Sequence, residues 1–527
     1  MLVPFLVFAI GVSHAAQKMN GIVQDIGRGT HKYVAARYTF RRLFLAGFTA
    51  LLADAVGFGV LMVIDIPVIQ DLALTASIGV AMLIFTNLLL LPVLLSYVGV
   101  SQAASARAMA KEGAEHRGRG LGVLWLVLER FTTRPWALGA VICSAVLTVA
   151  GFLVALDLKI GDLDPGAPEL RPDSRYNQDS NYIGSHYRLS NDQFVVIVKT
   201  RDDMCSDYRV LKETERLTWT LRQVPGVQSA TAMSDNVLNL VSGLQEGNPK
   251  WLTISRNPML LGTASQWTLT DNPEVVDTAC STIPVFAYLT DHKAETLKGV
   301  VAAVERFAAE HDGDDLKFLL AAGPAGIEAV TNIVVEKANR LMLLYVYAAV
   351  IVLCFITFRS WRAVVVAVIP LVITSILCEA LMAVLGIGVK VATLPVIALG
   401  VGIGVDYALY LLSVQLQNQR AGLPLGQAYK KAMEFTGKVV ALVGVTLAAG
   451  VITWAWSPIK FQADMGILLT FMFVWNMVGA LILIPALSHF LLRTEADRTE
   501  VASCQENGDK RADAPVQKVM KQALSVD

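Results

Sequence analysis

The run ATLPVIALGVGIGVDYALYLLS, residues 392–413, contains a single charged residue, Asp406. A helix needs about 20 apolar residues to cross the hydrocarbon core of a bilayer, so this run is long enough to span it. A carboxylate in hydrocarbon costs at least about 2.5–3.5 kcal/mol and is usually retained for a function. The run therefore predicts a membrane-spanning helix that carries a chemically active group.

The composition of the whole chain agrees with this prediction. Of its 527 residues, 54% are hydrophobic and 17% are charged, and the mean hydropathy is +0.52. These values predict a polytopic α-helical membrane protein and exclude a soluble enzyme. The 44 basic residues equal the 44 acidic ones, so no net charge favours nucleic acid as a partner. The six cysteines form no C-x-x-C motif or Cys/His cluster, so we expect no metal and no cofactor.

Nine apolar runs are candidates for membrane spans. They cover residues 2–16, 43–63, 72–98, 136–156, 341–358, 363–386, 392–413, 439–456 and 465–492. The first run also resembles a signal peptide, with small residues before Gln17, but it lacks a basic N-terminal region.

Basic residues gather in alternate connections, which places those connections in the cytoplasm. The connection 17–42 holds Lys18 and five other basic residues against Asp25 alone, and 101–134 holds six basic and three acidic residues. The long segment 158–338 has 17 basic and 25 acidic residues, so we expect it outside the cytoplasm.

The chain also repeats itself. At an offset of 393 residues, Gly11 falls on Gly404, Gly57 on Gly450, Asp71 on Asp464 and Pro92 on Pro485. Parallel repeats of this kind build transporters whose halves rock around a shared site. The first copy lacks the span and outer domain that precede the second copy, so we expect a chain that is truncated by about 270 residues at its N-terminus.

The outer segment 158–338 shows the pattern of a split βαβ domain. Strands are expected at 193–199, 227–232, 283–289 and 316–321, with helices near 207–222 and 293–310, and an irregular loop is expected at 240–272. Cys205 and Cys280 are its only cysteines, and in an oxidising compartment they can form a disulfide or remain free thiols.

The predicted division of the chain follows from these features. Three spans of the first repeat occupy residues 1–100, a cytoplasmic linker with an amphipathic helix occupies 101–134, and one further span occupies 135–157. The extracytoplasmic α/β domain follows at 158–338, then the five-span bundle of the second repeat at 339–492 and a disordered cytoplasmic tail at 493–527.

Four ionisable residues stand inside the predicted spans: His14, Asp54, Glu379 and Asp406. Asp406, next to Tyr407, is interpreted as a proton carrier, and His14 and Asp54 are candidates for a relay with it. The alternative is a structural carboxylate that bonds to a neighbouring helix. The glycines at 400, 402 and 404 do not match a nucleotide-binding loop, because they lie within a span. Gly400 and Gly404 have the spacing of close helix packing, and we expect Gly402 to share that role.

Several motifs resemble the resistance–nodulation–division superfamily, and among its branches the MMPL-like hydrophobe exporters of Gram-negative bacteria. They are GVGIGVDYALYLL (400–412), FRSWRA (358–363), GDLDPGAPELRPDSRYN (161–177) and IKFQADMG (459–466). The resemblance implies a multi-pass inner-membrane protein with a porter-like outer domain. It also implies proton-driven export of lipids or other hydrophobic compounds, with Asp406 and Tyr407 as the second-half relay pair. Ser13-His14 stands where the first-half pair would be. A homo-oligomer and a periplasmic or outer-membrane partner are further expectations.

Two other functions remain as alternatives. A non-transporting membrane protein could bind a lipid or a partner through a sterol-sensing-like bundle. A membrane enzyme has less support, since His186, His292 and His311 are isolated in the sequence and have the character of surface histidines.

Overall fold

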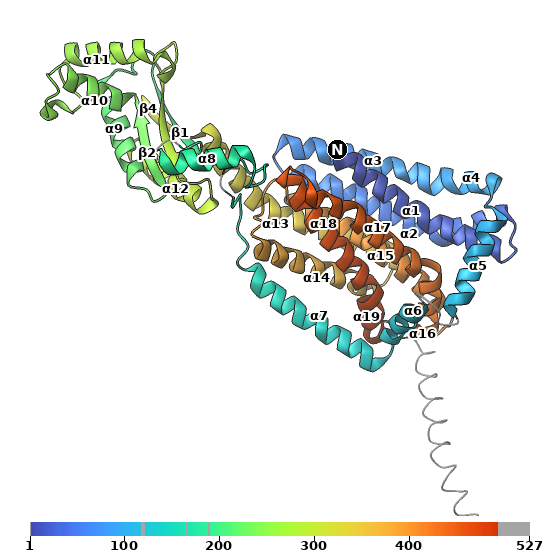
Figure 1. The fold of residues 1–527 in the computed structure, drawn as a ribbon. Coiled ribbons are helices and arrows are strands. Elements are labelled where there is room, and N and C mark those ends of the chain that lie inside the picture. Colours follow the sequence, from blue (N-terminus) through green and yellow to red (C-terminus); the bar gives the residue numbers. More distant parts are fainter. Residues whose placement is uncertain (1, 117–121, 165, 188–189, 494–527) are drawn as a thin grey trace, which may run out of the picture.

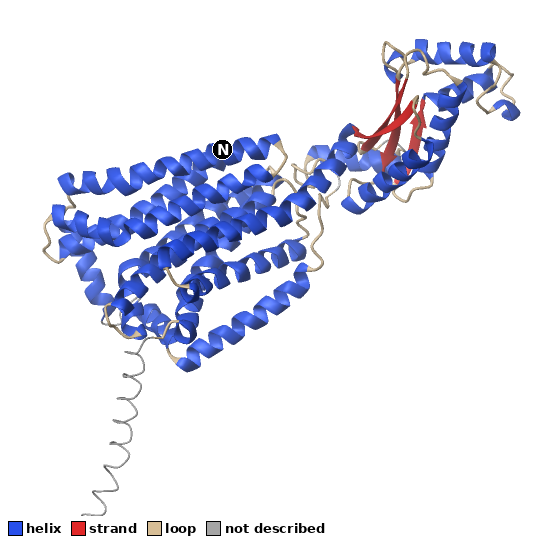
Figure 2. Ribbon diagram, turned by 180° about the vertical axis from the view of Figure 1, so that it is seen from behind, coloured by secondary structure: helices blue, strands red, loops and turns tan. Residues whose placement is uncertain are grey.

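A bundle of long helices carries a small α/β domain at one end (Figures 1 and 2). The computed structural model describes residues 2–116, 122–164, 166–187 and 190–493. The tail for which we expect disorder lies, from residue 494 onward, outside the described residues. The mostly helical membrane fold with one α/β domain is confirmed.

The bundle is built from helices of both repeats and their connections. Its α-helices are α1 (Leu2–Gly27), α2 (Lys32–Val60), α3 (Pro67–Leu83), α4 (Leu91–Val98), α5 (Gln102–His116), α6 (Gly122–Glu129), α7 (Arg134–Ala155), α13 (Gly323–Phe358), α14 (Trp361–Leu385), α15 (Leu394–Arg420), α16 (Leu425–Ala432), α17 (Lys438–Ile452), α18 (Lys460–Val478) and α19 (Ile484–Leu491). Short α6 contacts α5 and α16.

In the described part of the chain, eight continuous helices are long and apolar enough to cross a membrane. They are Lys32–Val63, Pro67–Val98, Arg134–Ala155, Gly323–Phe358, Trp361–Leu385, Leu394–Arg420, Leu425–Trp456 and Lys460–Leu491. The remaining predicted span belongs to α1, which packs against α2 and α3 but extends to Gly27 rather than ending near residue 16. This extension places Lys18 within a buried helix of the bundle, so Lys18 does not lie in a connection between two helices as expected.

The sequence repeat is matched by the boundaries of the helices. At the offset of 393 residues, α1 corresponds to α15, α2 to α16 with α17, α3 to α18, and α4 to α19. Both copies contain a wide π-helical turn, at η2 (Ile84–Leu90) and η8 (Gly479–Leu483). Each turn lies just before a proline, Pro92 or Pro485, which has no N–H to donate to the preceding turn.

Helix α15 is the most enclosed helix of the bundle, because small residues let its neighbours approach. It contacts α2, α13, α14 and α18 and is buried from Leu394 to Leu412. A side chain at Gly400 would meet Met472, and one at Gly404 would meet Asn476 and Leu371. The two glycines therefore leave room for side chains of α18 and, at Gly404, of α14 to pack against the backbone of α15.

The outer domain contains a four-stranded antiparallel sheet of order β2-β3-β1-β4. Its elements are α8 (Arg175–His186), β1 (Gln193–Thr200), α9 (Tyr208–Arg222), β2 (Val227–Ala232), α10 (Met233–Gly243), α11 (Pro258–Asp271), β3 (Thr282–Leu289), α12 (Ala294–His311) and β4 (Leu316–Ala322). Alternate apolar side chains of β1 and β3 pack beneath α9 and α12. The two strand–helix–strand units form the expected split βαβ arrangement.

The expected loop at 240–272 is wrong, because α11 occupies its second half. Asn257 accepts a hydrogen bond from the N–H of Met259, and Pro258 occupies the first turn. These are favourable signals for a helix start. Leu261 and Ala264 are buried where α11 packs on α10, so tertiary packing stabilises a helix with little amphipathic pattern of its own.

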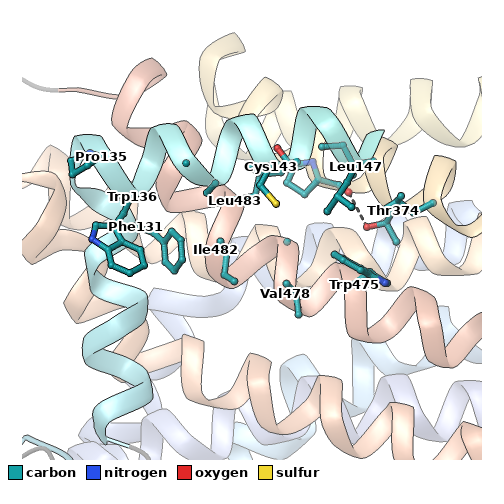
Figure 3. Close-up of a pocket in the computed structure, with 17 residues that line it drawn as sticks. Phe131, Pro135, Trp136, Cys143, Leu147, Thr374, Trp475, Val478, Ile482 and Leu483 are labelled. Atoms are coloured by element: carbon teal, nitrogen blue, oxygen red, sulfur yellow. Dashed lines mark hydrogen bonds between the residues drawn. The ribbon is translucent and has the colours of Figure 1, made fainter. Parts of the chain in front are cut away.

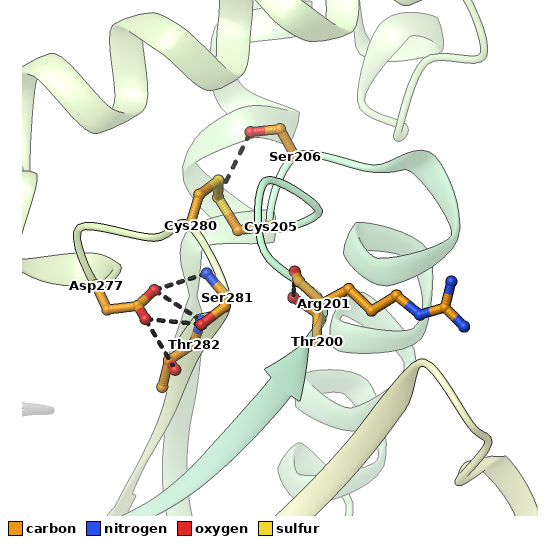
Figure 4. Close-up of a disulfide and its surroundings, with 8 residues drawn as sticks. All are labelled: Thr200, Arg201, Cys205, Ser206, Asp277, Cys280, Ser281 and Thr282. Atoms are coloured by element: carbon orange, nitrogen blue, oxygen red, sulfur yellow. Dashed lines mark hydrogen bonds between the residues drawn. A yellow bond between two sulfur atoms is a disulfide. The ribbon is translucent and has the colours of Figure 1, made fainter.

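Cys205 and Cys280 form a disulfide between the end of β1 and the start of β3 (Figure 4). Their Cα atoms are 5.0 Å apart, and the bond closes a sequence separation of 75 residues. Beside the disulfide, Asp277 accepts hydrogen bonds from the N–H and the hydroxyl group of Ser281 and from the N–H of Thr282. These hydrogen bonds, that of the Ser281 N–H above all, lower the pKa of Asp277 to about 2.

Replacing Cys205 and Cys280 together by serine should lower the free energy of unfolding of the outer domain by about 2–4 kcal/mol, because the unfolded chain gains freedom. Proteolysis of the purified chain at increasing urea, followed by identification of cleavage sites within 158–322, measures this loss. Cys143→Ser, which removes an exposed free thiol, is the control. An unchanged urea midpoint in the double variant would show that the bond does not stabilise the domain.

A cluster of buried ion pairs fastens the chain segment after α7 to the bundle. Lys390 Nζ lies 3.1 Å from Asp162 Oδ2 and 3.4 Å from Asp464 Oδ2. Lys460 Nζ lies 2.9 Å from the same oxygen of Asp464 and 3.0 Å from Asp164 Oδ2. Two lysines and three carboxylates thus join the α14–α15 connection, the start of α18 and the segment that leads to the outer domain. We call these five residues the ionic clamp.

Backbone contacts reinforce the ionic clamp. The guanidinium group of Arg171 donates hydrogen bonds to the carbonyl oxygens of Ser457 and Ala455, at 2.8 and 2.6 Å. Ile160 forms a β-bridge with Val389. The segment that leads to the outer domain is therefore joined to the bundle close to the starts of α15 and α18.

His292 is not the surface histidine that its isolated position in the sequence suggests. Its side chain is buried, and Nδ1 lies 3.0 Å from Asp192 Oδ1. Burial alone would lower the pKa of His292, but the hydrogen bond and charge of Asp192, together with the charges of Asp162 and Glu328, raise it overall.

This raised pKa predicts a pH-dependent outer domain. Protonated His292 stabilises the folded state fully below its unfolded pKa of about 6.5, and that contribution is lost as the pH rises through the folded value. The urea midpoint of the outer domain should therefore fall as the pH rises above about 6.5. His292→Gln should flatten this dependence, whereas exposed His186→Gln should retain it. Equal slopes for wild type and His292→Gln would contradict the assignment.

Candidate functional site

Three helices bring ionisable side chains together inside the bundle. His14 of α1, Asp54 of α2 and Asp406 of α15 are each no more than 2% exposed. His14 Nε2 lies 3.0 Å from Asp406 Oδ2 and 3.8 Å from Asp54 Oδ2. The sequence suggests a proton relay of these three residues and Tyr407, and the structure brings the three together.

The other ring nitrogen of His14 has a partner that the sequence analysis missed. His14 Nδ1 lies 2.7 Å from the hydroxyl of Tyr410. When Nε2 carries a proton toward Asp406, Nδ1 can accept a hydrogen bond from Tyr410; a protonated ring donates from both nitrogens. The imidazole therefore connects a carboxyl group to a phenol through two polar contacts.

Tyr407, the predicted partner of Asp406, is placed differently. It is buried, but its hydroxyl has no hydrogen-bond partner among the described residues. Residues four apart share a helix face whereas adjacent residues do not, so Tyr410 lies on the face of Asp406 and Tyr407 points elsewhere. The i, i+4 spacing was the signal that could have identified Tyr410.

Asp54 reaches the site because α15 has no side chain at Gly402. A Cβ atom added at Gly402 would lie 3.1 Å from Asp54 Oδ1. Asp54 Oδ2 and Asp406 Oδ1 have no hydrogen-bond partner within the described structure. Two carboxyl groups this close repel each other when both are ionised, so the pair binds a first proton more readily than a second, and the two steps belong to the pair rather than to either residue.

Lys18 is a second residue that the sequence analysis did not place at the site. It lies one turn after His14 on α1 and is 1% exposed, and its ammonium group has no hydrogen-bond partner in the described parts of the chain. A side chain at Gly47 of α2 would meet both the Tyr410 hydroxyl and Lys18 Nζ. Lys18 therefore adds a second ionisable side chain of α1 to the polar surroundings of His14.

The same cluster is a geometric match for a cation site. One ligand atom each from His14, Asp54 and Asp406 can be chosen so that all three lie within 4.8 Å of one another. One imidazole nitrogen and two carboxylate oxygens form a donor set that suits zinc.

The two halves of α15 differ in polarity. Between Leu394 and Val405 the buried side chains are aliphatic apart from proline and glycine. Beyond the cluster, toward the C-terminal end of α15, buried polar atoms of Gln17, Gln24, Gln415 and Gln419 lack hydrogen-bond partners among the described residues. A cavity of about 400 Å³ lies at this end and is lined in part by Gln24 and Asn418. Buried polar atoms of this kind are usually satisfied by water.

Comparisons with known proteins agree with this architecture. Residues 190–504 match the MMPL family. A membrane protein of Methanocaldococcus jannaschii, MJ1562, is 27% identical over 138 residues, which are 26% of this chain and 36% of that protein. The transport protein MmpL8 of Mycobacterium bovis is 26% identical over 169 residues, which are 31% of this chain and 16% of MmpL8.

A solved structure shows the same fold. SecDF, in a form described as super-membrane-facing, aligns with a TM-score of 0.50 and 12% identity over 96% of this chain and 55% of its own. The chain thus spans about half of SecDF, and its matches cover smaller parts of the other two relatives. The family match includes most of the outer domain and the helices from α13 to α19, among them α15 with Asp406. The chain therefore belongs to the MMPL family of transporters, within the resistance–nodulation–division type of permease.

Proposed function

We propose that this chain takes part in proton-driven export of lipids or other hydrophobic compounds across the bacterial inner membrane. The observation that carries the proposal is the buried contact of His14 with Asp406 and Tyr410, with Asp54 beside it. Ionisable groups within membrane spans are typical of proton relays. The proposal that the transported compound is hydrophobic is supported by the membership of the MMPL family and by the similarity to the transport protein MmpL8.

The relay connects the two repeats. His14 belongs to α1 of the first copy, and Asp406 belongs to α15 of the second. Protonation of Asp406 replaces a charged contact with His14 by a neutral one, which changes the attraction between the copies. A charge that crosses 100 mV yields about 2.3 kcal/mol, enough to bias a rocking equilibrium between repeats.

The polar half of α15 supports a direction for the proton in this conformation. Unpartnered polar atoms continue from the cluster toward the basic, cytoplasmic connections, whereas the outer half of α15 is aliphatic. The cluster then exchanges protons with the cytoplasm in the state described here. Access from the outside would require α15 to separate from its neighbours near Leu394.

His14→Gln tests the relay. Glutamine retains hydrogen-bonding capacity but cannot carry a proton at neutral pH, and loss of a proton-transfer group reduces rates by about 100-fold or more. Efflux of a hydrophobic dye from cells that express the chain should fall by about this factor. A protonophore should reduce wild-type efflux to the same level.

His186→Gln, at an exposed histidine of α8, is the matched control and should transport normally. Efflux by His14→Gln at the wild-type rate would rule out the relay. Efflux that persists in the presence of the protonophore would instead rule out proton coupling for any residue.

A further inference from the structure

A second, apolar cavity lies between α7, α14 and the region where α18 becomes η8 (Figure 3). Its volume is about 600 Å³. Trp136 and Phe131 lie near one end, Thr374 and Trp475 lie near the other, and Cys143 points in from α7. None of these residues belongs to the relay.

The cavity exists because α14 and α18 depart from regular α-helical geometry where they face small residues of α7. Pro370 interrupts the hydrogen bonding of α14, and the π-helical turn of η8 begins at Gly479, which lies against Pro370. In the middle of this face of α7 the lining residues are small, from Gly139 to Ser144, and a Cβ atom added at Gly139 would meet no atom within 4 Å. Side chains therefore do not fill the space between these helices.

The lining suits hydrocarbon rather than water. The hydroxyl groups of Ser144 and Thr374 donate hydrogen bonds to carbonyl oxygens of their own helices, Val141 and Pro370. The lining therefore offers few free polar groups to a water molecule, and apolar cavities stay dry. Most residues of α7 face away from the protein, so the cavity can be reached from the bilayer.

The cytoplasmic end of the cavity carries positive charge. The guanidinium group of Arg130 lies 5.8 Å from the ring of Trp136, which packs edge-on against Phe131. Arg134 begins α7, and both arginines are exposed. Exposed arginines at this depth attract the anionic headgroups of the cytoplasmic leaflet.

We propose that this cavity holds one acyl chain of an anionic phospholipid from the cytoplasmic leaflet, with its phosphate at Arg130 and Arg134. An apolar cavity that opens to the bilayer beside two arginines matches both parts of such a molecule. The lipid fills the space between α7 and α14 and so supports α7, whose outer end leads directly to the ionic clamp. The site does not depend on the proposed proton relay.

Cys143 provides a direct test, because its thiol lines the cavity and Cys354 and Cys378 are fully buried. In a Cys504→Ser background, alkylation of Cys143 by a maleimide is timed in nanodiscs of phosphatidylcholine, with and without phosphatidylglycerol. Phosphatidylglycerol should slow alkylation by about tenfold, as expected for a headgroup held by two cations.

Arg130→Gln with Arg134→Gln should remove the effect of phosphatidylglycerol, and Arg37→Gln, at an exposed arginine of α2, should leave it intact. Gly139→Leu, which places a side chain in the cavity, should reduce the phosphatidylglycerol that co-purifies with the chain. Equal alkylation rates in both lipid mixtures, or a phosphatidylglycerol effect that survives the double arginine variant, would overturn the proposal.

Discussion

Asp406→Asn is expected to reduce export to the background level, a loss on the order of 100-fold or more. Asparagine has the size of aspartate and can still hydrogen-bond to His14, so α1 and α15 should remain packed. It cannot release a proton, however, and the contact between the two repeats then stays in one state. The variant separates the chemistry of the site from its structure.

Dye efflux from cells, with membrane insertion checked by the amount of protein in purified membranes, measures this result. Glu379→Gln on α14 is the matched control, because it removes another carboxyl group within a span but outside the cluster. We expect that control to transport at a rate near that of wild type. Wild-type efflux by Asp406→Asn would show that Asp406 is a structural carboxylate.

Lys390→Met is expected to destabilise the attachment of the outer domain by about 3–5 kcal/mol, since it leaves the buried carboxylates of Asp162 and Asp464 without their shared cation. The side chains of Lys390 and Asp162 are only 10% and 4% exposed, so water cannot replace the lost partner well. Lys460 still reaches Asp464 but is not paired with Asp162 in the described structure.

Protease cleavage within 158–174, measured on the detergent-solubilised chain over a urea series, reports this loss. Lys298→Met is the control, because its ion pair with Glu336 is exposed and should be worth less than about 1 kcal/mol. Equal urea midpoints for the two variants would mean that the ionic clamp does not hold the segment. Restoration by the additional change Asp162→Asn would support the charge argument, because it removes one of the unpaired carboxylates.

Much of the fold could be predicted because its signals are local. Apolar runs of membrane length, basic connections and alternating strands each depend on neighbouring residues, so the spans and the four strands were found. The C-terminal boundary of α1 was not predicted. In the sequence, the polar residues that follow His14 have the pattern of a loop, and only the folded chain shows that helices of the second repeat cover them. That error assigned Lys18 to a connection between helices rather than to α1.

The candidate site was predictable in part. Asp406 is conspicuous as a charge in an apolar run, and the repeat drew attention to His14. Tyr410 was missed because the adjacent Tyr407 was preferred over the residue one turn away. The ionic clamp joins positions 162, 390 and 464, and only the folded chain shows that these residues meet.

Proton entry into liposomes is the measurement that tests the relay most directly. The purified chain is reconstituted with a pH-sensitive dye inside, and an inward proton gradient is imposed at fixed voltage in the presence of a hydrophobic substrate. The account predicts rapid acidification with wild type and Glu379→Gln, and slow acidification with His14→Gln and Asp406→Asn. Equal rates of acidification in all four samples would contradict it.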